Sequence, residues 1–181
     1  MLFDIHSDLF MDVDNRRVAG SRNAIAENHS ERLKAGGVTS MLAPLFINPY
    51  KKDVMHQKAR SMFKSMCAEL NDHKDSVVVA KCAQDFTDAE QQGKLALMLG
   101  SEGLCYIGEE ISLIEVFYQL GMREVSLTWN EDNCRRRKRG FEPWPNGDGE
   151  GTGEAHRGAW DDTRCFAHQR EEFLGYCKNC A

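Results

Sequence analysis

The sequence predicts an α/β protein with parallel strands. Through the first 133 residues, short apolar runs rich in β-branched side chains alternate with longer amphipathic runs. Alternation of this kind is typical of parallel strands joined by crossover helices. The 181 residues suffice for one core, but a complete eightfold (β/α)8 barrel usually needs roughly 250. We therefore expect one domain, or part of one.

The expected elements follow from the two kinds of run. We place strands in the apolar runs, at residues 2–6, 38–46, 76–81, 95–100 and 124–128. We place helices in the amphipathic runs, at residues 24–35, 54–71, 85–92 and 112–120. Gly36, Gly93 and Gly121 each stand just past an expected helix, where a left-handed cap is favoured. Five strands and four helices would make a little over half of an eightfold barrel.

The composition changes abruptly at Cys134. From there the chain reads CRRRKRGFEPWPNGDGEGTGEAHRGAW, a basic cluster followed by a Gly-rich acidic stretch without apolar periodicity. Such a segment buries too little apolar surface to offset the entropy lost when its backbone is ordered. We therefore divide the chain into a folded region, residues 1–133, and a tail, residues 134–181, that we expect to be disordered.

The net charge and the N-terminal residues indicate which classes of binding partner to expect. The net charge of −5 and the pI near 5.7 argue against nucleic acid and anionic membranes as partners. Asp4, His6 and Asp8 interrupt the apolar run that a signal peptide needs, and no run approaches the ~20 apolar residues of a membrane span. We expect a cytoplasmic protein that acts on small molecules or peptides.

The cysteines indicate reduced, mostly buried thiols rather than a disulfide framework. There are seven, an odd number, and Cys67, Cys82 and Cys105 stand far apart. Cys177 and Cys180 form one C-x-x-C pair. A four-ligand zinc site would need a second pair, and a redox motif would need a strand-turn-helix setting, so neither function is assigned.

His6 and Asp8 form an H-x-D pair at the end of the first expected strand. Residues two apart on a strand point to the same face, so both side chains could reach one metal ion at the strand's carboxyl end. Active sites of barrel enzymes lie at that end. The pair also occurs by chance, and a histidine capped by a nearby aspartate is the competing interpretation.

Glu102 follows an apolar strand in the segment LALMLGSEGL. Flanking glycines allow an ion to approach the backbone closely, although a solvated turn glutamate is the alternative. Because the H-x-D pair and Glu102 both follow parallel strands, they share one rim, which favours a metal site. The strand EVSLT brings Trp129 and Asn130 to the same rim, where Trp129 is either core or a pocket wall. The other histidines lack ligand spacing and are expected at the surface: His29, His56, His73, His156 and His168.

Together and in this order, these motifs resemble the renal (membrane) dipeptidase family of metallopeptidases. The opening H-x-D matches, and so do the segments ERLKAGGVTSMLAPLFI, GKLALMLGSEGL and ISLIEVFYQLGMREVSLTWNEDN. The resemblance implies the N-terminal half of a (β/α)8 TIM barrel of the metal-dependent hydrolase type. It also implies that the intact enzyme hydrolyses dipeptides with two Zn²⁺ ions, and a homodimer is one form that it could take.

The resemblance also implies roles for single residues. His6 and Asp8 would bind the first zinc, and Glu102 would bridge both ions, which lower the pKa of a shared water. Trp129 stands where several members have a histidine proposed to contact the substrate, so no substrate-binding or catalytic residue is assigned. Two later histidines, an arginine and an aspartate of the family pattern are absent from the tail.

A changed reading frame explains the tail. If residues 159–180 are back-translated and read from the second base of each codon, one permitted sequence is LGMILDVSHINEKSFWDIAKIA. It contains the family's segment G-M-x-x-D-V-S-H, whose histidine binds the second zinc. Trp160 has a single codon, and its shifted position permits only Gly. We infer that the frame changed near Asn133 or Cys134, by mutation or by a sequencing error.

Three hypotheses follow. The first is a truncated, frame-shifted zinc dipeptidase that is inactive as this chain. The second is a non-catalytic metal-binding or interaction fragment. The third is a different amidohydrolase-like barrel, but such barrels usually open with H-x-H, where this chain has Asp8.

Overall fold

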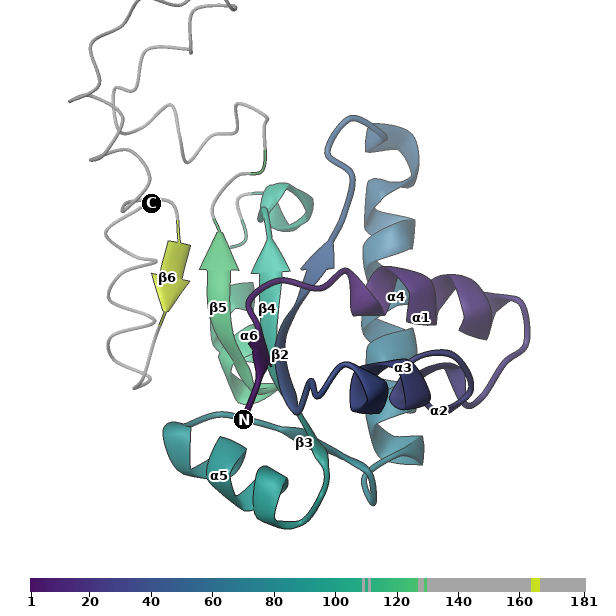
Figure 1. The fold of residues 1–181 in the computed structure, drawn as a ribbon. Coiled ribbons are helices and arrows are strands. Elements are labelled where there is room, and N and C mark those ends of the chain that lie inside the picture. Colours follow the sequence, from purple (N-terminus) through teal and green to yellow (C-terminus); the bar gives the residue numbers. More distant parts are fainter. Residues whose placement is uncertain (109, 111, 127–128, 130–163, 167–181) are drawn as a thin grey trace, which may run out of the picture.

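A computed structural model describes residues 1–108, 110, 112–126, 129 and 164–166. They form one sheet with helices packed beside it (Figure 1). The strands are β1 (Phe3–Asp4), β2 (Ser40–Phe46), β3 (Val77–Val79), β4 (Leu95–Glu102), β5 (Met122–Ser126) and β6 (Arg164–Phe166). The helices are α1 (Leu9–Val18), α2 (Ala24–Asn28), α3 (Ser30–Ala35), α4 (Lys52–Asp72), α5 (Ala83–Gln91), α6 (Leu113–Gln119) and the short 3-10 helix η1 (Cys105–Ile107). The predicted α/β class is confirmed.

Four parallel strands lie in the order β1-β2-β4-β5, which is half of an eightfold barrel. The strand β3 is also parallel to β4, so the five expected strands are present, but β3 lies outside this series. β2 occupies one edge of β4 along its whole length, in register from Ser40↔Ala96 to Phe46↔Glu102. β3 pairs only with the first residues of β4, on the edge of β4 that is opposite β2. β5 pairs with the later residues of that same edge. The strand β4 therefore has β2 along one edge, and β3 and β5 one after the other along the opposite edge.

The last described strand, β6, runs antiparallel to β5, with Val125 opposite Cys165. It is the only part of residues 134–181 that the structure describes. We expected the tail to be disordered and assigned no ligand role to His156, His168 and the C-x-x-C pair. These predictions concern residues that lie outside the described part.

The core lies between the sheet and the helices α1, α4 and α6. All but the last residue of β2 are buried, as expected for a parallel strand that is covered on both faces. Leu45, Leu97 and Leu99 of the sheet belong to the same buried cluster as Phe10 of α1 and Met62 of α4. Figure 1 shows α1 and α4 side by side next to β2. This packing fixes the start of α1 relative to the carboxyl ends of the strands.

Helix α1 was not expected from the sequence. Leu9, Phe10 and Val13 are buried on its inner face, but Asp14 is buried there too. The charged side chain interrupts the apolar pattern by which a helix is recognised. The single helix expected over residues 24–35 is divided into α2 and α3 at His29.

The buried carboxylate of Asp14 accepts hydrogen bonds from side chains of α4. Its carboxylate accepts hydrogen bonds from Ser61 Oγ (2.8 Å), Ser65 Oγ (2.7 Å) and Lys58 Nζ (2.5 Å). Burial alone would raise the pKa of the Asp14 carboxyl, but these donors outweigh burial and hold the pKa below its ordinary value of 3.8. The charged form therefore stabilises the contact between α1 and α4.

We expect this carboxylate to make the fold sensitive to acid. A folded-state pKa below the unfolded value contributes stability above the ordinary aspartate pKa, and the contribution is lost as pH falls through the folded pKa. Asp14→Asn should lower the free energy of unfolding at pH 7 by about 1–3 kcal/mol, and by less at pH 3. Urea titrations at both pH values measure this, with the exposed Asp75→Asn as control. A loss that is equal at both pH values would refute it.

A second buried carboxylate, Glu69 of α4, joins three helices. It accepts hydrogen bonds from Arg17 Nη1 of α1 (2.5 Å) and from the backbone N–H of Ile25 of α2 (2.7 Å). His73 Nε2 lies 3.4 Å from Glu69 Oε1. Arg17 also donates to Asp72 (2.8 Å). The hydrogen bonds from Arg17 and from the Ile25 N–H compensate part of the cost of burying the Glu69 charge.

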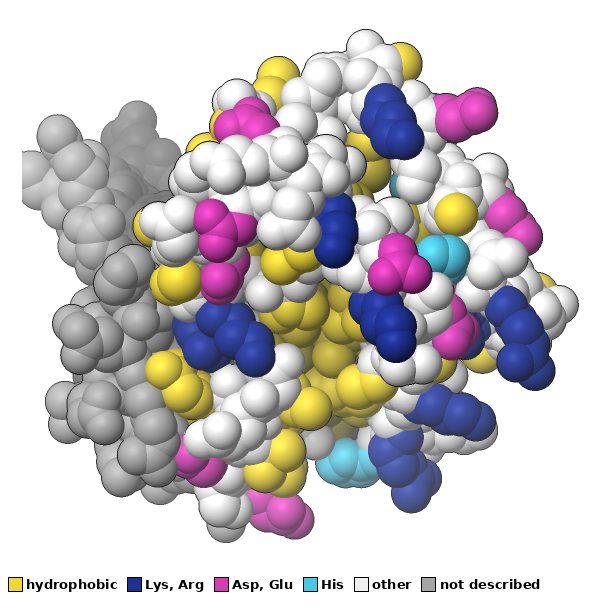
Figure 2. Space-filling view, turned by 90° about the horizontal axis from the view of Figure 1, so that it is seen from below, with side chains coloured by type: hydrophobic (Ala, Val, Ile, Leu, Met, Phe, Trp, Pro, Cys, Tyr) yellow, Lys and Arg dark blue, Asp and Glu magenta, His cyan; other side chains and the backbone are white. Residues whose placement is uncertain are grey.

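The amino ends of the strands enclose a hollow of about 250 Å³. Figure 2 shows this end of the molecule, with apolar side chains at its centre and Lys and Arg side chains around them. Leu33, Val38, Val77 and Leu95 are among the lining residues. Because barrel enzymes bind substrates at the opposite end, we assign no site to this hollow. Among the described residues, no helix combines the length and the apolar composition that crossing a membrane requires.

Candidate metal centre

His6 and Asp8 lie in the loop between β1 and α1, and not on the strand itself. The strand ends early, although the N–H of Ser7 still donates to the carbonyl of Leu42 in β2 (3.0 Å). The N–H of His6 donates to the Asp4 carboxylate (3.1 Å). The expected shared strand face is therefore wrong, but this loop still carries both side chains to the carboxyl end of the sheet.

Glu102 is the last residue of β4, and the turn after it is firmly held. The N–H of Gly103 donates to Ser126 Oγ of β5 (2.8 Å), and Ser101 Oγ accepts or donates a hydrogen bond with the buried Tyr106 hydroxyl (2.8 Å). Gly103 has a φ of 80°, a conformation that other residues rarely adopt. The segment G-S-E-G thus ends the strand, and the bonded turn that begins at Gly103 holds the backbone next to the Glu102 carboxylate.

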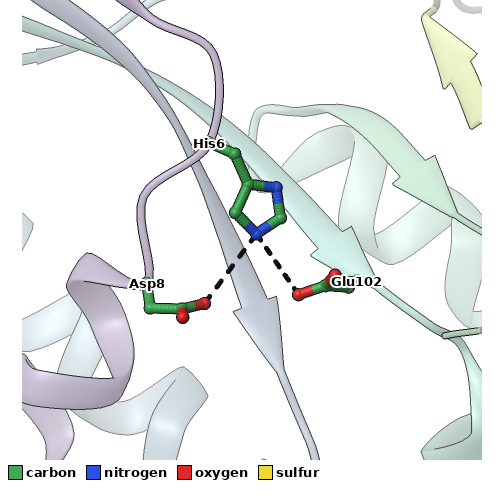
Figure 3. A group of neighbouring side chains, drawn as sticks. All are labelled: His6, Asp8 and Glu102. Atoms are coloured by element: carbon green, nitrogen blue, oxygen red, sulfur yellow. Dashed lines mark ion pairs between the residues drawn. The ribbon is translucent and has the colours of Figure 1, made fainter.

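The three side chains converge on one point (Figure 3). His6 Nε2 lies 3.3 Å from Glu102 Oε2 and 3.9 Å from Asp8 Oδ1. One ligand atom from each residue lies within 4.8 Å of the other two. Glu102 is the most buried side chain of the three, at 18 % exposed, and Asp8 is the most exposed, at 51 %. The group therefore opens to solvent on the Asp8 side.

This group has the donors that a zinc ion prefers. One imidazole nitrogen and two carboxylate oxygens are common zinc ligands, with bonds of about 2.0–2.2 Å. Two donors bound to one tetrahedral ion at such distances lie ~3.3–3.5 Å apart, close to the separation of His6 Nε2 and Glu102 Oε2. Small side-chain rotations would bring Asp8 to the same separation. The residues therefore fit a single metal ion, while their role as ligands stays a prediction.

Three aromatic side chains, which we call the aromatic wall, stand at the same rim: Phe46, Tyr50 and Trp129. The ring centroids of Phe46 and Trp129 are 5.0 Å apart, and those of Tyr50 and Trp129 are 6.3 Å apart, both edge to face. Trp129 is therefore a wall residue and not part of the core. The sequence allowed both interpretations. Phe46 and Tyr50 were not singled out, because only the fold brings them to Trp129.

The histidines and cysteines outside this group are placed as follows. His29 and His73 were expected at the surface, but the structure buries them partly against carboxylates, His29 against Asp12 (2.8 Å) and His73 against Glu69 (3.4 Å). Their neighbours lie across helix contacts that the sequence does not reveal. His56 is exposed, as expected. Cys67, Cys82 and Cys105 were expected to be mostly buried, but Cys67 and Cys82 are exposed and Cys105 is half-buried. Within the described ranges no other group of three potential ligands occurs.

The fold is that of a partial α/β barrel, with the candidate metal centre at the carboxyl ends of its strands. Residues 1–136 match the family model of the membrane dipeptidases, peptidase family M19. The chain therefore belongs to this family.

Curated relatives agree with this assignment. The chain is 30 % identical to the dipeptidase tcpJ of Claviceps purpurea over 91 residues, which are 48 % of this chain and 21 % of that protein. It is 40 % identical to the uncharacterized dipeptidase C965.12 of Schizosaccharomyces pombe over 53 residues, which are 29 % of this chain and 13 % of that protein. The chain thus spans only a small part of these relatives.

Solved structures share the fold. The dipeptidase AC, a metallopeptidase of family M19, superposes with a TM-score of 0.62 at 16 % identity, over 73 % of this chain and 44 % of that one. A metallopeptidase from Rhodobacter sphaeroides, solved with a phosphinate mimic of the dipeptide L-Ala-D-Ala, superposes with a TM-score of 0.60 at 16 % identity, over 73 % and 46 %. The chain spans less than half of each of these proteins.

Proposed function

We propose that the folded region is the N-terminal half of a zinc dipeptidase and that His6, Asp8 and Glu102 bind one Zn²⁺ ion. The observation that carries this proposal is the convergence of one nitrogen and two oxygen ligands within 4.8 Å at the carboxyl rim. Membership of a family of dipeptidases supports the same substrate class. The intact enzyme would take dipeptides as substrates.

The three residues divide the work of holding the ion. A bound zinc would supply Lewis-acid activation of a water molecule. His6 offers a neutral donor, while Asp8 and Glu102 bring two negative charges that compensate those of the ion. The N–H of Gly103 donates to Ser126 Oγ, and this hydrogen bond supports the proposed role of Glu102 because it holds the turn beside its carboxylate.

The same residues do not complete a two-metal site. Within the part of the chain that the structure describes, no second group of ligands accompanies the first. Binding and activating a dipeptide between two ions requires additional donors and groups that hold the peptide ends. We therefore propose that residues 1–181 alone are inactive. A non-catalytic metal-binding fragment is the alternative, and the three-ligand group supports it equally.

Zinc titration tests the ligand assignment. Glu102→Gln should weaken zinc binding by about 100-fold or more, because even changes outside the first ligand sphere commonly cost 10–100-fold. Bound zinc should also raise the melting temperature in proportion to its occupancy. The matched control is Glu31→Gln, the same exchange at an exposed position of α3. Equal zinc affinity for both variants would remove Glu102 from the site.

A further inference from the structure

We propose that the hydroxyl groups of Ser126 and Tyr106 hold the two peptide groups on either side of Glu102 and thereby position its carboxylate. The inference rests on the function proposed above and deepens it, since it assigns two positioning residues that are not metal ligands themselves. Neither residue was singled out from the sequence. The contacts of Ser126, those of the Tyr106 hydroxyl and those of the Tyr106 ring support it.

The buried side chain of Ser126 is bonded to both peptide groups that flank Glu102. The pairing of β4 with β5 ends at Glu102↔Ser126, so Gly103 lies beyond the ladder. Its N–H donates to Ser126 Oγ instead (2.8 Å). The Ser126 hydroxyl in turn donates to the carbonyl of Ser101 (3.5 Å), a longer contact on the other side of Glu102. One hydroxyl thus satisfies backbone groups that the strands leave unpaired.

Tyr106 is bonded to the same turn through Ser101. Ser101 Oγ donates to the carbonyl of Gly103 (2.9 Å) and lies 2.8 Å from the Tyr106 hydroxyl. A serine hydroxyl has one proton, and here the carbonyl accepts it, so the Tyr106 hydroxyl is the donor to Ser101. Burial raises the pKa of Tyr106 above its ordinary value of 10, so the donor keeps its proton at neutral pH.

The ring of Tyr106 is itself held by two helices. Its centroid lies 6.1 Å from that of Phe63 in α4 and 6.0 Å from that of Phe117 in α6, and the two phenylalanine rings stack at 5.2 Å. Aromatic pairs at such separations attract each other. The packing of α4 and α6 therefore places the Tyr106 hydroxyl, and the bond to Ser101 extends this support to the turn after Glu102.

The support matters for the metal ion because its ligands have to be in place when it binds. A carboxylate on a mobile backbone would be ordered only on binding, and the cost of that ordering weakens affinity. Groups outside the first ligand sphere commonly change metal affinity by about 10–100-fold. Ser126 and Tyr106 act on the backbone beside Glu102 and not on its carboxylate, so we expect an effect near the lower limit.

Zinc titration of the full chain, in competition with a chelator, tests the proposal. Ser126→Ala and Tyr106→Phe should each weaken zinc binding about tenfold. Ser126→Thr keeps the hydroxyl and should bind zinc nearly as tightly as the unchanged chain. The matched control is Ser65→Ala, which removes another buried serine hydroxyl, one that donates to Asp14 in the contact between α1 and α4. This control should lower stability and leave the zinc affinity unchanged.

Hydrogen exchange of the Gly103 amide gives a second reading, in the absence of zinc. Ser126→Ala and Ser65→Ala are compared at equal free energy of unfolding, with urea added to the more stable of the two. The Gly103 amide should exchange about fivefold faster in Ser126→Ala, because it has lost its acceptor. A general loss of stability would not produce this difference.

The outcomes separate this proposal from the previous one. If the unchanged chain binds zinc and Ser126→Ala binds it as tightly as Ser65→Ala, the positioning role is refuted and the metal proposal stands. Equally weak binding by Ser126→Ala and Ser126→Thr would also refute the role of the hydroxyl. If the unchanged chain binds no zinc, the metal proposal fails. Faster exchange of the Gly103 amide in Ser126→Ala would then still uphold the hold on the turn, and equal exchange would overturn both proposals.

Discussion

The 181-residue chain is expected to show no dipeptidase activity, whereas a chain with the shifted frame restored is expected to be active. His6, Asp8 and Glu102 can hold one ion, but they leave a second ion and the ends of the peptide without ligands. Loss of orientation and of the shared water together should lower kcat/KM by at least about 10³-fold. The difference between the two chains should therefore be the largest effect available in this system.

Hydrolysis of Leu-Leu in the presence of zinc measures that difference. In the restored chain, Glu102→Gln should abolish activity while Glu31→Gln should retain it. The DNA around codons 130–140 provides an independent check, because the shifted frame must encode D-V-S-H downstream. Zinc-dependent hydrolysis by the short chain that disappears in Glu102→Gln would show that a single-metal half barrel is sufficient.

Arg17→Ala should destabilise the fold more than any exposed substitution. Arg17 is 13 % exposed and Glu69 is completely buried, so the variant leaves a carboxylate in the core without its cation. Breaking a buried ion pair in this way costs about 3–5 kcal/mol. Because Arg17 also bonds Asp72, the contact between α1 and the end of α4 is lost as well.

The neighbouring residue provides a matched control. Arg16 pairs with Asp12 on the exposed side of the same helix, and such pairs contribute only about 0–1 kcal/mol. Urea denaturation of Arg17→Ala and Arg16→Ala at pH 7 compares the two, since equal slopes would show that only stability has changed. Similar losses of unfolding free energy in both variants would contradict the assigned role of Glu69.

The strands were predictable from the sequence where they are covered on both faces. β2 and β4 consist mostly of apolar residues because helices and sheet neighbours remove both faces from water. β5 is less apolar, since it contains Arg123 and Glu124. The order of the strands was not predictable, since an apolar run does not record its partner. β3 looks like its neighbours in the sequence, yet it pairs with the start of β4 outside the series. The sequence did not predict α1 because its buried face contains the charged side chain of Asp14.

The candidate site was predictable to the extent that its residues follow strands. Glu102 ends a strand that the sequence marks clearly, and its segment predicted a position at the rim. His6 and Asp8 reach the same rim from a loop, so the expected position was right although the expected backbone conformation was wrong. Their binding of zinc stays a prediction. The aromatic wall depends on contacts between distant segments, which no local pattern contains.

During translation, β2 is synthesised before β4, the strand with which it pairs along its whole length. Each of its residues pairs with one that lies 56 positions later in the chain. At the usual 5–20 residues per second of synthesis, the wait is roughly 3 to 11 seconds. For that time an apolar segment emerges from the ribosome without the strand that covers its edge. A chaperone that binds extended apolar segments would therefore meet β2 first, and pausing between codons 47 and 94 would lengthen the encounter.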